Sequence, residues 1–128
     1  MNRTEAVIQS IEVSDTVHSI KLNSNGQCIY CMTLVLDQSI NIGDRVIVSF
    51  KETSLILCSS PMPECTIENQ FPARVDSINE GQILAEIRFN SAIGDLSAVV
   101  LKKFVERLSL NQGQNVVIFI PETEISLT

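Results

Sequence analysis

The sequence predicts an all-β protein made of two small barrels in tandem. The chain repeats itself, because residues 6–11 (Ala-Val-Ile-Gln-Ser-Ile) return as residues 73–78 (Ala-Arg-Val-Asp-Ser-Ile), 67 positions later. Short runs of Val, Ile and Leu, with only five Phe, one Tyr and no Trp, are typical of β-strands. Each repeat has about the size of the smallest domains that fold unaided, so we expect the two repeats to share an interface.

The ends of the two copies also match. Residues 43–53 correspond to residues 113–123, now at an offset of 70, so the second copy carries three extra residues in its middle. An internal repeat of this kind indicates two structural units, and the positions where the copies differ are the most informative in the chain.

The first repeat covers residues 1–58. Alternating apolar and polar residues, separated by turn-forming residues, predict strands at residues 5–11, 16–22, 27–36, 45–50 and 54–58. The Asn25-Gly26 pair between two such runs is a strong hairpin signal. Residues 59–64 contain two prolines and are expected to form a short, semi-rigid linker.

The second repeat covers residues 65–128, with strands predicted at 66–78, 83–89, 115–120 and 124–127. Val100, Phe104 and Leu108 recur every four residues, which predicts a short helix in the second half of residues 95–108, before the strand at 115–120. The corresponding stretch of the first copy is shorter and is expected to hold no more than a turn of helix. Five short strands with a small helix before the fourth are the order of an OB-type barrel.

Composition excludes several classes of function. The net charge is −6, from nine basic and fifteen acidic residues, which argues against direct binding to nucleic acid. Neither a signal peptide nor a membrane-spanning run is visible, so we expect a cytoplasmic protein with no membrane insertion. No paired-acid motif, phosphate-binding loop or zinc signature appears, and His18 has no assignable partner, so an enzyme is not expected.

Four cysteines leave two interpretations open. Cys28 and Cys31 form a Cys-x-x-Cys pair, which could hold zinc or act as a redox couple. The pair lies in a predicted strand, however, where residues three apart point to opposite faces. We therefore favour reduced, packed thiols for these two and for Cys58 and Cys65.

Two segments of the second copy resemble a known family. Residues 69–78 (Asn-Gln-Phe-Pro-Ala-Arg-Val-Asp-Ser-Ile) are similar to the opening Asn-Gln-Leu-x-Gly-x-Val-x-Ser-Val of the molybdenum-binding TOBE/Mop family, which includes the molbindins. Residues 104–116 are similar to its Ser-Val-x-x-Leu-Gly-Leu-x-x-Gly-x-x-Val. The resemblance extends over both copies. It implies two tandem OB-type (TOBE/Mop) barrels of five strands each.

The resemblance also implies a function. Such a protein would bind the oxyanion molybdate or tungstate, without an organic cofactor, in molybdenum storage, sensing or transport. It would form a homo-oligomer, a dimer or trimer, with anion sites at interfaces, and a molybdate transporter or regulator would be a further partner. A tetrahedral dianion needs converging N–H and hydroxyl donors and local positive charge.

The sequence departs from the family at these positions. The family's Ser-Ala-Arg-Asn-Gln is Thr-Ile-Glu-Asn-Gln at residues 66–70, so that Glu68 replaces a cation. Its late Lys-[Ser/Ala]-[Ser/Thr] is Lys-Glu-Thr at residues 51–53 but Pro-Glu-Thr at 121–123, where Pro121 has neither the ammonium nor a backbone N–H.

Two hypotheses follow. In the first, the residues that keep a suitable donor form one oxyanion site across an interface, with Lys51 meeting the segment of Thr66: Lys51, Thr53, Thr66, Asn69, Ser97 and Lys102, or Lys103 in its place. In the second, the site has decayed and the fold serves oligomerisation or partner recognition. Structural roles also suit some of these residues: Ser97 as a helix cap, Thr53 in a turn, and Asn69 bonded to a strand end.

Overall fold

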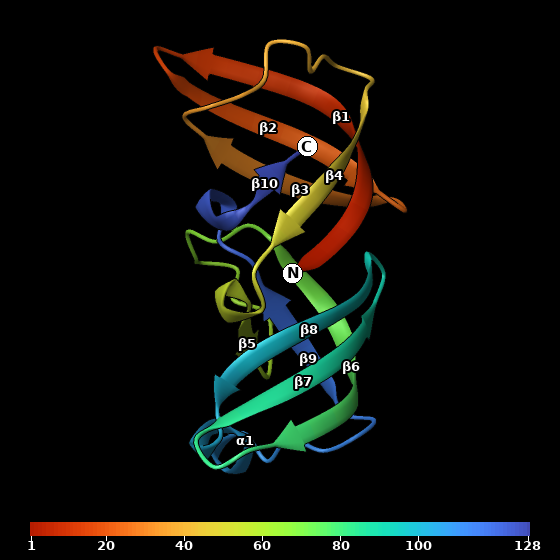
Figure 1. Cartoon of the computed structure of the whole chain (residues 1–128), viewed down its shortest axis with the longest axis vertical. Coiled ribbons are helices and arrows are strands. Elements are labelled where there is room, and N and C mark those ends of the chain that lie inside the picture. Colours follow the sequence, from red (N-terminus) through yellow and green to blue (C-terminus); the bar gives the residue numbers. More distant parts are fainter.

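The computed structural model describes all 128 residues and contains two five-stranded antiparallel sheets, one above the other in Figure 1. The strand order is β10-β4-β1-β2-β3 in the first sheet and β5-β9-β6-β7-β8 in the second. Both sheets curl into half-open barrels, so the prediction of an all-β, tandem OB-type fold is confirmed.

The strands and 3₁₀ turns follow one another in the same order in both repeats, and the second repeat has an additional short helix. The first repeat contains β1 (Asn2–Ser14), β2 (Val17–Ser24), β3 (Gln27–Thr33), β4 (Arg45–Phe50), the 3₁₀ turn η1 (Glu52–Ser54) and β5 (Ile56–Cys58). The second contains β6 (Gln70–Glu80), β7 (Leu84–Ser91), β8 (Gly94–Leu101), α1 (Lys103–Arg107), β9 (Asn115–Phe119), the 3₁₀ turn η2 (Glu122–Glu124) and β10 (Ser126–Leu127).

Each sheet takes its fifth strand from the other repeat. After β4 the chain turns through η1 and crosses over, so that β5 pairs with β9 of the second sheet. After β9 it turns through η2 and returns, so that β10 pairs with β4 of the first sheet. The two sequence repeats and the two sheets therefore do not coincide, and neither sheet has five strands without the other repeat.

Local features recur at equivalent positions in the two copies. β1 has a register shift between Ile8 and Ser10, and β6 has one between Val75 and Ser77. The hairpin predicted at Asn25-Gly26 is confirmed, since it joins β2 to β3 with φ values of 51° and 82° at these two residues. Both values lie in the left-handed region that a two-residue hairpin turn requires.

The segment before the helix was predicted incorrectly. We expected helical character from Val100, but residues 94–101 form strand β8, paired with β7, and α1 has only five residues. The alternation of buried Leu96 and Ala98 with more exposed neighbours is the two-residue period of a strand. The four-residue spacing of Val100, Phe104 and Leu108 spans the end of that strand and the start of the helix.

Several predicted strand ends also differ from the structure. The strand predicted at 27–36 ends at Thr33, and no helix follows it before β4. The strand predicted from residue 66 begins only at Gln70. The strands predicted at 54–58 and 124–127 each begin within a 3₁₀ turn, because the chain must change direction there to reach the other sheet.

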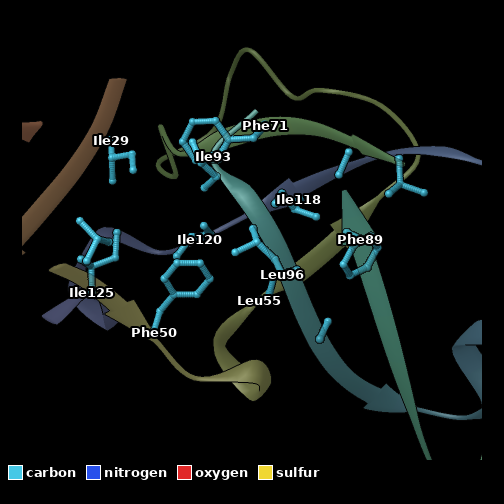
Figure 2. Close-up of a cluster of buried hydrophobic side chains, with 14 of the residues drawn as sticks. Ile29, Phe50, Leu55, Phe71, Phe89, Ile93, Leu96, Ile118, Ile120 and Ile125 are labelled. Carbon is cyan, nitrogen blue, oxygen red and sulfur yellow. The ribbon is translucent and has the colours of Figure 1, made fainter. Parts of the chain in front are cut away.

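The interior is one continuous core. Twenty-five buried residues from both sheets form a single hydrophobic cluster. In Figure 2, Phe50 at the end of β4 lies beside Ile120 and Ile125, which precede and follow η2. The exchanged segments thus contribute side chains to the core as well as backbone pairing. The helices in this core are short, and none has the length and apolarity to span a bilayer.

Because the core is shared, we expect unfolding in urea to be a single cooperative transition. Ile125→Ala should lower the free energy of unfolding by about 3 kcal/mol, since it leaves a cavity at a residue that is 4% exposed. Ile83→Ala, at a residue that is 71% exposed, is the matched control and should have little effect. Two separate transitions by circular dichroism would contradict the shared core.

Candidate functional site

Two turns of the chain occupy equivalent places and lie near each other. The turn η1 packs against β8 of the second sheet, and η2 packs against β3 of the first sheet. Both coils are on the same side of the molecule in Figure 1. The Ser54 hydroxyl of η1 donates a hydrogen bond of 3.2 Å to the Glu124 carboxylate of η2. The residues predicted to bind an oxyanion, apart from Lys102, divide between the surroundings of these two turns.

A buried asparagine fixes the surroundings of η1. The Asn2 side chain is bonded twice to the backbone of Ser97 in β8: its Nδ2 donates to the Ser97 carbonyl and its Oδ1 accepts from the Ser97 N–H, both at 2.8 Å. Asn2 was not among the residues predicted from the sequence. It stands 67 positions before Asn69, so the repeat itself could have identified it.

Asn69 makes the equivalent contact on the other side. It is fully buried, its Oδ1 accepts from the Tyr30 N–H at 2.8 Å, and its Nδ2 donates to the carbonyls of Tyr30 at 2.7 Å and Ile120 at 3.0 Å. Both side-chain N–H groups therefore have partners, and none faces a ligand. Tyr30 and Ser97 are themselves 67 positions apart, so the two asparagine clamps are related by the repeat.

We call the region where η1 packs against β8 the first turn site, and the predicted residues on these elements or directly beside them are Lys51, Thr53 and Ser97. Thr53 lies on η1 and Lys51 directly precedes this turn, and both residues are exposed. Ser97 is half-buried on β8, the strand against which η1 packs. Ser97 lies within β8, so it does not cap the helix. The terminal amine of Met1 donates to the Glu52 carboxylate, and this hydrogen bond lowers the pKa of Glu52.

Thr66 and Asn69 belong to a different region, the second turn site, formed with η2. Thr66 is exposed in the segment that leads into β6. The Glu68 N–H donates to the Glu122 carboxylate at 2.5 Å. Pro121 occupies the position that Lys51 holds in the first copy, so this site has carboxylates and no ammonium. In each turn one glutamate, Glu52 or Glu122, accepts a hydrogen bond from the opening segment of its own copy.

Lys102 lies apart from both groups. It holds the N-cap position of α1, and its backbone N–H donates to the Ile83 carbonyl at 2.7 Å. It lines a shallow pocket with Gln82, Ile83 and Glu106. Lys103, the alternative cation, lies over the ring of the neighbouring Phe104, 5.4 Å from its centroid.

The cysteines are free thiols, and Cys31 is the most enclosed of them. Its Sγ lies 3.6 Å from the Ile125 carbonyl, and burial raises the pKa of this thiol to about 11. Cys28, three positions earlier on the same strand, is half-buried. No group of three or more His, Cys, Asp or Glu side chains is placed to hold a metal ion. Cys31 acts as a packing residue of the core.

An apolar groove adjoins each turn. One, of about 450 Å³, is lined by Thr53 and by residues of β5, β8 and α1, including Val100 and Phe104. The other, of about 530 Å³, is lined by Thr123 and by Met32, Leu34 and Val35 at the end of β3. These grooves are again equivalent in the two copies, but only the first is bordered by a helix.

The asparagine clamp can be tested directly. Asn69→Ala should lower the free energy of unfolding by about 3 kcal/mol, because it leaves the Tyr30 N–H and two carbonyls buried without partners. Asn79→Ala, at an exposed position of β6, should change it little. Equal effects of the two substitutions in urea titrations would show that Asn69 does not hold the strand edge.

Comparison with known proteins agrees with the fold described above. Residues 66–127 match the family model of the TOBE domain. A crystal structure of the cytoplasmic molybdate-binding protein ModG with molybdate bound superposes with a TM-score of 0.87 and 18% identity, over 98% of this chain and 94% of that chain. No curated protein matches the sequence. As the resemblance predicted, residues 66–127 belong to the TOBE domain family, and the chain as a whole has the fold of ModG.

Proposed function

We propose that this chain is a cytoplasmic molybdate-binding protein whose oxyanion site is the first turn site. The observation that supports the proposal is that η1, which contains Thr53 and directly follows Lys51, packs against β8 of the other copy, where Asn2 holds the backbone of Ser97. An ammonium and hydroxyl groups gathered from two segments are the donors that a tetrahedral dianion requires. ModG, which shares this fold, is described as a molybdate-binding protein.

Charge distinguishes the two turn sites. The first contains Lys51 next to Glu52, whose carboxylate already has the Met1 amine as a partner. The second contains Glu68 and Glu122, with no lysine or arginine in the turn, and the Glu124 carboxylate of the same turn is bonded to Ser54 of the other turn. A dianion is attracted to the first arrangement and repelled by the second, and the effect is largest where water is partly excluded. We therefore assign the oxyanion to the first site.

Molybdate and tungstate are both tetrahedral dianions, and either suits this donor set. The ligand needs no organic cofactor, and its binding requires no chemical step, so the proposed activity is binding for storage, sensing or transport rather than catalysis. The alternative is an interaction module that has lost oxyanion binding and works with a molybdate transporter or regulator. The occupied side chain of Asn69 favours that alternative for the second half of the chain.

We further propose that the protein forms a homo-oligomer, a dimer or trimer. Several large apolar side chains remain exposed where β3 ends, and Val35 reaches 84% exposure. Together with Met32 and Leu34 it borders the groove beside Thr123. A second copy covering this face would remove apolar surface from water, as homo-oligomer interfaces do.

The oxyanion proposal predicts that Lys51→Ala raises the dissociation constant for molybdate about tenfold or more, because a charge-assisted hydrogen bond is lost. Lys103→Ala removes an equal charge from α1 and is the matched control, expected to bind as the unchanged protein does. Calorimetry against molybdate, tungstate and sulfate measures both. Absence of binding at millimolar oxyanion would refute the proposed function.

The oligomer proposal predicts a mass in sedimentation equilibrium of two or three times the 14.1 kDa of one chain. Replacing both Leu34 and Val35 by Asp should give monomers, since charges would then lie in the apolar face. Ile83→Asp, at a comparably exposed apolar position just before β7, should leave the mass unchanged. A monomeric unmodified protein would exclude the oligomer.

A further inference from the structure

In each 3₁₀ turn, one carboxylate accepts a hydrogen bond from a backbone nitrogen of the segment that opens the same copy. In the second copy the Glu68 N–H donates to Glu122, and in the first copy the Met1 nitrogen donates to Glu52. The two nitrogens stand 67 positions apart and the two glutamates 70, which are the two offsets of the repeat. The contact therefore follows from the fold, because it recurs although one nitrogen is an amide and the other an amine.

The backbone around Glu122 explains how the contact forms. The Ile120 N–H donates to the Asn69 carbonyl at 3.0 Å, so the end of β9 and the residue before β6 run side by side. Two residues beyond Ile120, Glu122 reaches back along this pair to the N–H of Glu68. That amide is directed toward η2 at the place where the equivalent nitrogen of the first copy faces η1.

We propose that Glu122 is a specificity-determining residue. Its carboxylate accepts the hydrogen bond of the Glu68 amide in the second turn site, and it thereby confines oxyanion binding to the first turn site. The inference rests on the proposed function and assigns the stoichiometry of the same kind of site. Because the carboxylate accepts the hydrogen bond of this N–H group, the group is not available to an oxygen atom of an oxyanion. The carboxylate also places a negative charge where a dianion would have to lie.

Two neighbours of Glu122 strengthen this effect. Glu68 supplies the bonded amide and a second carboxylate, whereas the Glu124 carboxylate accepts from the Ser54 hydroxyl of the other turn. Pro121 removes one further backbone donor from the turn. The first turn site also has a carboxylate, Glu52, on the equivalent nitrogen, but there Lys51 and the Met1 amine supply positive charge beside it.

The test compares two serine substitutions on one turn. Glu122→Ser removes the carboxylate from the Glu68 amide, and Glu124→Ser removes an equal charge whose carboxylate is hydrogen-bonded to the Ser54 hydroxyl instead. Calorimetry with sodium molybdate gives the stoichiometry and affinity of each full-length variant, with circular dichroism to verify folding. We expect one molybdate per chain in the unmodified protein and in Glu124→Ser, and two per chain in Glu122→Ser. The second molybdate should bind to Glu122→Ser at least about tenfold more tightly than a second molybdate binds to the unmodified protein.

The inference and the proposed function fail in different ways. An unchanged stoichiometry in Glu122→Ser, an equal gain in Glu124→Ser, or two molybdates in the unmodified protein would overturn the role of Glu122. If the unmodified protein bound no molybdate while Glu122→Ser bound one, the proposed function would fail and the role of Glu122 would stand. In the double variant Lys51→Ala/Glu122→Ser, retention of a single molybdate would place the gained site at the second turn and support the inference.

Discussion

The structure depends on two reciprocal amide contacts between its halves. Asn2 opens the first copy and holds β8 of the second sheet through both backbone groups of Ser97, while Asn69 opens the second copy and holds β3 of the first sheet through Tyr30. A primary amide can satisfy a strand's N–H and C=O together, and burial makes the loss of either costly. These contacts fix β8 and β3, against which η1 and η2 pack, and so determine where both turn sites lie.

Much of the fold could be predicted because it is encoded locally. The repeated segments, the alternation of apolar residues and the Asn25-Gly26 turn each act over a few residues, and the TOBE resemblance agreed with them. Two features could not be predicted in this way. β8 was missed because one apolar spacing crosses the boundary between a strand and a helix. The exchange of β5 and β10 depends on where the chain travels after each 3₁₀ turn, and no pattern within these short strands specifies a partner.

The candidate site shows the same division between local and distant information. Suitable residue types pointed to Lys51, Thr53 and Ser97, and the fold packs η1, which follows Lys51 and contains Thr53, against the strand that contains Ser97. Residue type could not reveal that the amide of Asn69 is already occupied by Tyr30, which lies 39 positions earlier. Nor could it show that Glu122 reaches the Glu68 amide 54 positions away. The occupancy of a donor is a property of the folded chain, so residue type alone overestimates the number of residues available to a ligand.

The exchange of terminal strands also bears on how the protein is made. The first sheet contains β10, whose residues Ser126–Leu127 lie almost at the C-terminal end of the sequence. A nascent chain emerging from the ribosome therefore cannot complete its first sheet until residues 126–127 have been synthesised, whereas domains are usually able to fold in the order of translation. Until then β4 exposes an unpaired edge, and the closing contact spans most of the polypeptide, which slows folding. The exchange thus makes completion of the first sheet depend on the last strand of the second repeat.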